Sequence, residues 1–250
     1  MNEPDYSYIG SNAHVMVREY GSAAPFLPVG NCSELNVSPQ EDVIKLPDFT
    51  GPGGGVRNSV SRINDVQFSL KFHDMNADNM NRFLRGTSTT VTSGAVTAEQ
   101  VVAYKGGLIP LAKIAKTITS VSPYPTGTAY TVGTDYQLDN GGLYIPSTST
   151  IPNATGGAPN IKVDYTYDAH TLTEAFVNTA KQYELLFTSM NDARSGNPVR
   201  VWAYKVSAGV LSEMALIATD YFGGTVTGSL LADPTRGAGL SKYFSAVVVG

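Results

Sequence analysis

Residues 26–86 read FLPVGNCSELNVSPQEDVIKLPDFTGPGGGVRNSVSRINDVQFSLKFHDMNADNMNRFLRG, and they hold the clearest secondary-structure signals of the chain. Within residues 59–72, apolar and polar side chains alternate with a period of two, which is typical of a half-buried strand. The apolar positions are Val66, Phe68, Leu70 and Phe72. The segments 34–37 and 42–46 predict either a second pair of strands or one bent strand. This stretch therefore predicts a long β-hairpin.

The same stretch predicts one loop and one helix. Residues 48–59, DFTGPGGGVRNS, are rich in glycine and contain Pro52, so they predict a long exposed loop inside the hairpin. Residues 77–86, ADNMNRFLRG, place their apolar side chains at helical spacing. Asn76 is suited to cap the amino end of this helix, and Gly86 is expected to close it as the C′ residue. No other segment predicts a helix as clearly.

Composition agrees with a β-rich protein. Only 15% of the 250 residues are charged, whereas 25 are Gly, 14 are Pro and 14 are Tyr, which favours strands and tight turns over long helices. The net charge of −4 disfavours tight binding to phosphate backbones. The amino terminus, MNEPDYSYIG, lacks the basic and apolar character of a signal peptide, which predicts a soluble chain made in the cytoplasm. The single cysteine, Cys32, excludes an intrachain disulfide.

The middle of the chain differs from its flanks. Residues 97–167 are rich in Gly, Pro, Thr and Tyr, and they predict several short antiparallel strands with a DNGG hairpin turn at residues 139–142. We expect an inserted, outward-facing β-rich subdomain there, between the two parts of a framework at 1–96 and 168–250. The alternative is that these strands belong to the main β-structure. The sequence predicts further framework strands at residues 13–20, 181–190, 199–206, 224–231 and 242–249.

Catalytic and cofactor sites are poorly supported, and we expect no enzyme, no metal and no cofactor. None of His14, His73 and His170 occurs in a metal-ligand spacing, and Cys32 has no histidine near it in the sequence. The glycine-rich loop is not followed by the Lys-Ser or Lys-Thr of a phosphate-binding loop. Carboxylate pairs of a glycosidase do not stand out either. Tyrosines that suggest either sugar stacking or cross-strand packing are Tyr8, Tyr20, Tyr104, Tyr124, Tyr130, Tyr136, Tyr144, Tyr165 and Tyr167.

Several motifs in a fixed order resemble phage tail tube proteins, also called major tail proteins. The motifs are VGNCSELNVSP, LPDFTGPGGG, the HDMN corner and the helix ending FLRG within residues 26–86, then NDARSGNPVRVWAYKV at 191–206 and GSLLADPTRGAGLSKYF at 228–244. The resemblance covers about residues 1–95 and 168–250. It implies a mainly β fold, a tail-tube β-barrel or β-sandwich with one short flanking helix, to which residues 97–167 add an inserted subdomain.

The resemblance also implies a function. Tail tube proteins form hexameric rings that stack into a tube, and DNA passes through the tube without specific binding. The expected partners are further copies of the chain and other tail proteins, namely the tape measure, the terminator and the baseplate or tip, with no membrane involved. The expected location is the virion tail, after synthesis in the host cytoplasm. The alternative function is a carbohydrate-binding or adhesion β module, which the tyrosines suggest.

Two sets of residues are candidates for roles in such a tube. The polar face of the main strands is expected to line the lumen, while Val66, Phe68, Leu70, Tyr183, Leu185 and Phe187 pack inward. The candidate lumen-facing residues are Gln67, Ser69, Glu184, Thr188, Thr225, Thr227 and Ser229. The candidate inter-ring loop contains Asp48, Pro52, Gly53, Gly54, Gly55 and Arg57. A one-residue error in the phase of any strand exchanges its two faces.

Overall fold

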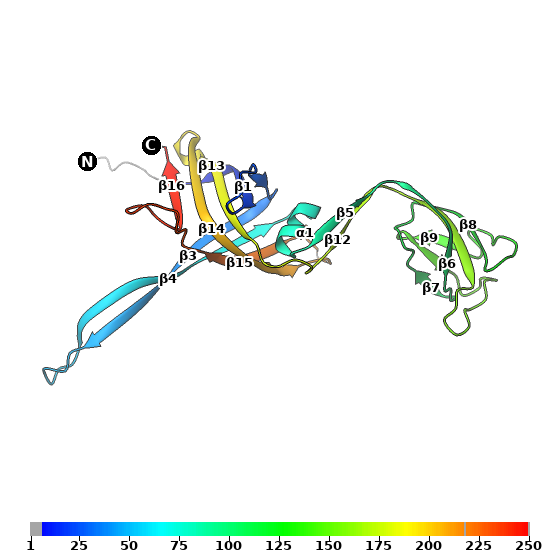
Figure 1. The fold of residues 1–250 in the computed structure, drawn as a ribbon, viewed down its shortest axis with the longest axis horizontal. Coiled ribbons are helices and arrows are strands. Elements are labelled where there is room, and N and C mark those ends of the chain that lie inside the picture. Colours follow the sequence, from blue (N-terminus) through cyan, green and yellow to red (C-terminus); the bar gives the residue numbers. More distant parts are fainter. Residues whose placement is uncertain (1–6, 218, 250) are drawn as a thin grey trace. The chain divides into compact units, whose positions relative to one another are not determined.

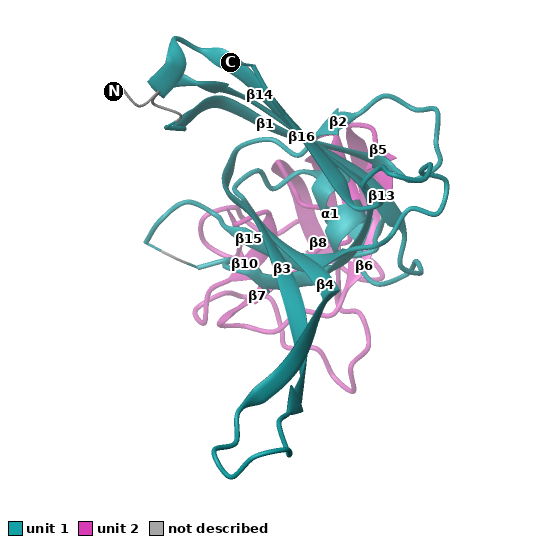
Figure 2. Cartoon of the chain, turned by 90° about the vertical axis from the view of Figure 1, so that its left-hand side faces the viewer, with its two compact units in different colours: residues 1–87, 173–250 teal, residues 88–172 magenta. Residues whose placement is uncertain are grey.

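The chain is mainly β, as predicted, with one short α-helix. A computed structural model describes residues 7–217 and 219–249. Residues 1–6, which belong to the amino-terminal segment of the signal-peptide argument, lie outside the described residues. The structure divides into two compact units, Met1–Thr87 with Thr173–Gly250 (unit 1) and Ser88–Leu172 (unit 2) (Figure 2). In the described ranges, no helix is long and apolar enough to span a membrane.

Unit 1 is built on one antiparallel sheet (Figure 1). Its strands are ordered β2-β1-β13-β14-β15-β4-β3, and β16 pairs with the first part of β14. The strands are β1 (Gly10–Glu19), β2 (Leu27–Pro28), β3 (Cys32–Pro47), β4 (Val56–Phe72), β13 (Gln182–Asn191), β14 (Asn197–Met214), β15 (Gly224–Leu230) and β16 (Phe244–Val248). A 3-10 turn, η1 (Asp192–Arg194), connects β13 to β14. Among the residues that the structure describes, the sheet of a single chain is open, with β2 and β3 at its two ends, and does not close into a barrel.

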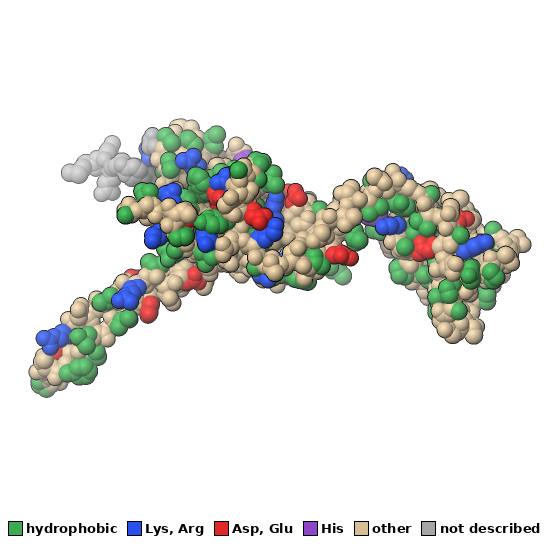
Figure 3. All heavy atoms as spheres, in the orientation of Figure 1, with side chains coloured by type: hydrophobic (Ala, Val, Ile, Leu, Met, Phe, Trp, Pro, Cys, Tyr) green, Lys and Arg blue, Asp and Glu red, His purple; other side chains and the backbone are tan. Residues whose placement is uncertain are grey.

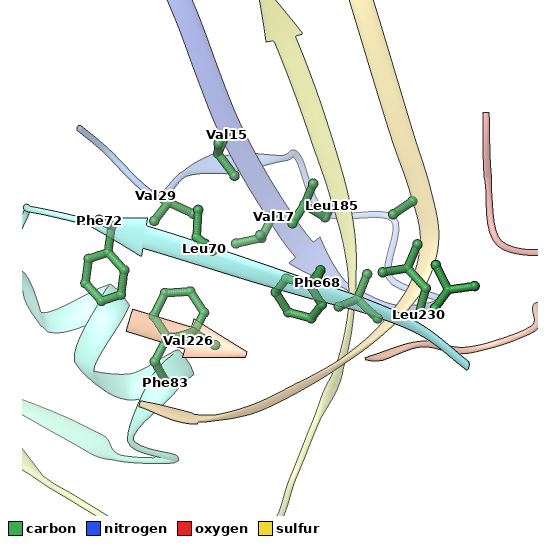
Figure 4. Packing of buried hydrophobic residues seen from close by; sticks show 13 residues of the cluster. Val15, Val17, Val29, Phe68, Leu70, Phe72, Phe83, Leu185, Val226 and Leu230 are labelled. Atoms are coloured by element: carbon green, nitrogen blue, oxygen red, sulfur yellow. The ribbon is translucent and has the colours of Figure 1, made fainter. Parts of the chain in front are cut away.

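One face of this sheet carries the core of unit 1 (Figure 4). The predicted inward-facing residues Val66, Phe68 and Leu70 are each at most 4% exposed, and Leu185 is also buried. Tyr183 and Phe187 are half-buried. The helix contributes Phe83, whose ring lies 5.1 Å from that of Phe72 between centroids.

The helix α1 (Ala77–Phe83) begins as predicted but ends differently. The side chain of Asn76 accepts a hydrogen bond from the backbone N of Asn79, as expected of the N-cap. The C′ position is held by Arg85, at φ 51°, and not by Gly86. Gly86 follows it and donates its backbone N–H to the carbonyl of Asn81, the 6→1 bond of a Schellman motif. A Cβ at Gly86 would lie 2.8 Å from the carbonyl oxygen of Glu174, so close approach accounts for this glycine.

Unit 2 has its own sheets and its own core. The sheet β7-β10-β9 contains β7 (Gly107–Ile109), β9 (Gln137–Asp139) and β10 (Gly142–Ile145), and the sheet β6-β11-β8 contains β6 (Gly94–Val101), β8 (Thr117–Pro123) and β11 (Ile161–Tyr167). The predicted turn between β9 and β10 has positive φ at Asn140 and Gly141. The buried cluster includes Tyr136 and Tyr165.

The boundaries of unit 2 lie outside the expected range 97–167. β6 begins at Gly94 because it pairs with β11 as far as Tyr167. A two-stranded ribbon of β5 (Thr87–Val91) and β12 (His170–Glu174) lies at the boundary with unit 1.

The hairpin of β3 and β4 extends beyond the sheet as a two-stranded arm, defined here as residues 40–65 (Figure 1). β15 pairs with β4 only along residues 67–72, so the arm has no third strand. Its loop spans residues 48–55 and is closed by a 2.8 Å hydrogen bond from the backbone N of Asp48 to the carbonyl of Gly55. The loop is shorter than the expected 48–59 because Val56 and Asn58 pair with Pro47 and Leu46.

Candidate functional site

The sheet face opposite the core carries rows of uncharged polar side chains in the part formed by β3, β4 and β15. Ser38, Gln67 and Ser229 lie opposite one another in neighbouring strands, and Asn36, Ser69 and Thr227 form the next row. We call these six residues the polar face. All of them except Asn36 line a hollow of about 340 Å³, together with Phe68 and Gly228. Hydroxyl and amide groups of this kind bind water and present no net charge.

A third row beside the polar face is charged but mixed in sign. Thr225 lies opposite Lys71 on one side and Glu213 on the other, and Lys71 lies opposite Glu34. Five of the seven candidate lumen-facing residues therefore share one region of the sheet, and they are Gln67, Ser69, Thr225, Thr227 and Ser229.

Gly228 forms the floor of the hollow for a steric reason. A Cβ at this position would collide with the carbonyl oxygen of Ser207 and would come within 2.6 Å of the Phe68 ring. No side chain fits between the strands here. The close approach of the strands around Gly228 therefore requires a glycine, which the alternation pattern did not single out.

Glu184 stands on the same face but does not line an open surface, which corrects the prediction. It is 7% exposed, and its Oε2 accepts a 2.7 Å hydrogen bond from Nη2 of Arg18, directly across from it on β1. The Arg18 guanidinium lies over the ring of Phe26, 4.5 Å from its centroid, and 5.9 Å from that of Trp202. The alternation of β13 places Glu184 on the face opposite Leu185, whereas its partner Arg18, with the Phe26 ring under the guanidinium, comes from other segments.

Thr188 belongs to a separate groove at the other end of the sheet. His14, Thr188, Arg200 and Val247 form one row across β1, β13, β14 and β16. Two residues further along, Met190 lies opposite Pro198, whose carbonyl accepts a hydrogen bond from the backbone N of Val249. We call the groove between these rows the end groove. It has a volume of about 430 Å³ and is lined mostly by apolar surface.

The tip of the arm contains five of the six candidate inter-ring residues. Asp48, Pro52, Gly53, Gly54 and Gly55 lie in the loop, whereas Arg57 lies in β4. Oδ1 of Asp48 accepts hydrogen bonds from the hydroxyl and the backbone N of Thr50, and these bonds lower the pKa of the Asp48 carboxyl. Phe49 beside it is 83% exposed.

Exposed apolar side chains occur along the arm, among charged and other polar ones (Figure 3). Val43, Ile44, Leu46, Val56, Val60 and Ile63 are each between 45% and 58% exposed. Ile44 lies opposite Val60, and Val43 projects from the other side of the ribbon. Both sides of the arm therefore carry exposed apolar side chains among polar and charged ones.

The histidines and the cysteine occupy ordinary structural positions. Both ring nitrogens of His73 have partners, since Nδ1 lies 2.7 Å from the carbonyl of Phe222 and Nε2 lies 2.9 Å from the Ser33 hydroxyl. Burial raises the pKa of the Cys32 thiol to about 11, so the thiol is protonated at neutral pH. Across the residues that the structure describes, no three His, Cys, Asp or Glu side chains are grouped as metal ligands.

Comparison with known proteins places the chain in a family. No curated protein matches the sequence. A family model matches residues 8–247, which is almost the whole chain and includes both units. The chain therefore belongs to the family described as "Protein of unknown function UCP028589".

Proposed function

We propose that the chain is the structural subunit of a bacteriophage tail tube, in which six copies form a ring and stacked rings enclose the channel for DNA. The ordered motifs of residues 26–86, 191–206 and 228–244, described above, support this proposal. All three segments lie in unit 1, and together they contribute to β3, β4, α1, β14 and β15.

The observation that carries the proposal is the arm. A two-stranded ribbon is marginally stable by itself in water, and this one exposes apolar side chains on both sides. A subunit that remained a monomer would leave this surface in water. In a tube, neighbouring copies cover the sides of the arm, and its tip, with Asp48 and Pro52, reaches the adjacent ring.

The open sheet supports assembly in the same way. β3 pairs with β4 along one edge only, and its other edge is free over a strand of 16 residues. Free strand edges tend to pair with other chains, and a closed ring removes them. We propose that the sheets of six subunits continue into one another and form the barrel that a single chain lacks.

The polar face is proposed to line the channel. Gln67, Ser69, Thr227 and Ser229 present hydroxyl and amide groups, which offer DNA phosphates no cation to bind. Thr225 would extend the lining into the neighbouring row, where Lys71 is accompanied by Glu34 and Glu213, so that row has no excess of positive charge. The net charge of −4 has the same consequence. DNA then passes without specific binding. Glu184 is excluded from this lining because it is 7% exposed and paired with Arg18.

Unit 2 is proposed to face outward, since a channel has no room for an additional 85-residue unit. The remaining partners proposed are the tape measure, terminator and baseplate or tip proteins, with the virion tail as location and the host cytoplasm as the site of synthesis. No catalytic role is proposed.

The second candidate, a carbohydrate-binding or adhesion module, rests on the tyrosines of unit 2. Tyr136 and Tyr165 are at most 4% exposed and belong to the core, so they are not available for stacking. Tyr104 and Tyr124 are 48% and 39% exposed. Retention of the purified protein on a sugar column, abolished by replacing these two residues with Ala, would favour this candidate.

Negative-stain electron microscopy of the purified full chain tests the first proposal directly. We expect rings with sixfold symmetry and an axial hole, or tubes built from them, at high protein concentration. A monomer at every concentration, measured by light scattering, would contradict the proposal. A ring of another symmetry would retain the tube but contradict the hexamer.

A further inference from the structure

We propose that the end groove is the acceptor for the arm tip of a second copy of this chain, with Phe49 as the anchoring side chain. This contact rests on the proposed function, because it identifies the surface that the arm of one subunit meets on another. Both surfaces belong to unit 1, and they differ from the polar face and from the sides of the arm.

The end groove has the floor of an apolar binding site. Met190 lies in β13, between β1 and β14, whereas Val247 lies in the edge strand β16 and Val249 directly follows it. These three side chains are 43%, 44% and 45% exposed. Its volume of about 430 Å³ lies within the ~300–1,000 Å³ range of pockets that enclose ligands. An aromatic ring above the sulfur of Met190 would add a favourable sulfur–aromatic contact.

The arm tip carries the matching anchor. Phe49 is 83% exposed in the loop at the end of the arm, directly after the last paired residues of the hairpin. The neighbouring glycines, Gly51 and Gly53, have no heavy atom within 4 Å of a Cβ position, so another molecule has room to approach the backbone. Aromatic side chains that fill a partner's pocket are the usual anchors of protein interfaces.

Charge complementarity favours this occupant over a general apolar partner. Arg200 and His14 are exposed at the wall of the end groove. Asp48 directly precedes Phe49, and the two hydrogen bonds from Thr50 both involve Oδ1, which leaves Oδ2 to face a cation. Docking Phe49 on Met190 and Val247 therefore brings an ionised carboxylate near a guanidinium.

The contact must form between copies. Figure 1 shows the arm leading away from the sheet region that contains β16 and β13, and in the single chain both Phe49 and the groove are uncovered. Donor and acceptor are different surfaces, so the contact is heterologous. A heterologous contact of this kind leaves one free tip and one free groove after each addition, which is the property that an open-ended stack requires.

Disulfide trapping in the full chain tests the contact. In a Cys32→Ser background, one protein carries Gly51→Cys at the tip, which retains Phe49 and Asp48, and a second carries Val247→Cys in the groove. After mixing and mild oxidation we expect a covalent dimer that contains one copy of each. In the matched control, the second protein carries Thr148→Cys, at an exposed position of unit 2, instead of Val247→Cys.

A charge exchange tests the proposed pair independently. Asp48→Arg and Arg200→Asp are each expected to raise the protein concentration needed for assembly by about tenfold, and the combined variant is expected to restore assembly. A merely structural effect of either change would not be reversed by the other. Phe49→Ala should weaken assembly by about tenfold or more, from the lost burial of one aromatic side chain.

The outcomes separate this contact from the proposed function. The contact is wrong if tubes form but the cysteine pair gives no more covalent dimer than the control pair, and the combined charge exchange does not restore assembly. The tube proposal would then still stand. A wild-type chain that stays monomeric overturns both. Trapping in the absence of stacked rings supports the contact and counts against the tube.

Discussion

Nη2 of Arg18 lies 2.7 Å from Oε2 of Glu184, and the two side chains are only 24% and 10% exposed. Phe26 and Trp202 pack around the guanidinium, so the pair is removed from most of the solvent. This sheet face therefore has two different parts. It is an open polar surface at β4 and β15, whereas the aromatic rings of Phe26 and Trp202 pack on it where Arg18 of β1 pairs with Glu184 of β13.

This pair predicts a measurable stability difference. Glu184→Gln leaves the Arg18 charge half-buried without its carboxylate, and we expect the free energy of unfolding to fall by about 1–3 kcal/mol. The matched control is Lys181→Ala, which breaks the exposed ion pair with Glu19 (2.9 Å; side chains 51% and 53% exposed) and should cost at most about 1 kcal/mol. Urea unfolding at protein concentrations below assembly provides the measurement. Equal losses in both variants would contradict the burial argument.

A second prediction concerns the floor of the polar hollow. Gly228→Ala places a methyl group against the carbonyl of Ser207 and the ring of Phe68, so we expect a loss of about 1–3 kcal/mol in unfolding free energy. Gly53→Ala at the arm tip meets no neighbouring atom and should change stability by less than about 0.5 kcal/mol. Thermal unfolding of both variants, monitored by circular dichroism, measures the difference. A Gly228→Ala variant as stable as Gly53→Ala would show that the strands can separate without cost.

Residues 26–86 show how much the sequence predicted. The structure confirms the alternation around Phe68 and Leu70, the N-cap at Asn76 and the start of the glycine-rich loop, because each depends on neighbours only a few residues apart. The loop ends earlier than predicted, since β4 already begins at Val56. The helix end was less accurate, since Arg85 takes the left-handed conformation and Gly86 is needed for its approach to Glu174.

Features made by several strands could not be predicted. The end groove requires the register of four strands, which places Thr188 beside Arg200 and Val247, and no pattern within β13 carries that information. The pairing of Glu184 likewise depends on Arg18, which is 166 residues away in the chain. An acidic residue opposite an arginine on a neighbouring strand would predict an ion pair, but only once the pairing of the two strands is known.

A pH dependence is predicted for unit 2. Asp135 accepts hydrogen bonds from the backbone N of Thr131 and from the backbone N and hydroxyl of Thr150, at 2.8 to 2.9 Å, and they lower the pKa of its carboxyl. A carboxyl whose pKa is lower in the folded chain than in the unfolded chain stabilises the fold when it is ionised. This stabilisation is fully present above the pKa of the unfolded chain, about 3.9, and is lost as the pH falls through the pKa of the folded chain. The denaturant midpoint of unit 2 should therefore decline below about pH 4.

The variant Asp135→Asn isolates this contribution. We expect it to lower the denaturant midpoint at pH 7 and to flatten the decline at acid pH, because the amide does not titrate. Asp139→Asn, at an exposed position of the β9 strand, is the matched control and should retain the wild-type pH profile. An unchanged acid profile in Asp135→Asn would assign the decline to other carboxyls.

The lumen assignment predicts a defect in DNA passage. Ser69→Lys combined with Thr227→Lys places two cations side by side on the polar face, in paired positions of β4 and β15. In each ring of six these would bind the phosphates of the passing DNA and slow its release. Phage carrying the double variant should form intact tails and show reduced infectivity. Ser147→Lys with Thr148→Lys, at exposed positions of unit 2, is the control that should leave infectivity unchanged. Full infectivity of both variants would mean that another face lines the channel.

Unit 2 is predicted to be dispensable for tube formation. Residues 88–172 form a separate core, and their ends are close, because a Cβ at Gly86 would lie 2.8 Å from the carbonyl oxygen of Glu174. A short Gly-Ser linker can therefore join Thr87 to Thr173 without moving β4, α1 or β13. Electron microscopy of this variant should show tubes of unchanged bore and smaller outer diameter. Insoluble protein, or a folded variant that forms no rings, would show that unit 2 belongs to the assembling structure.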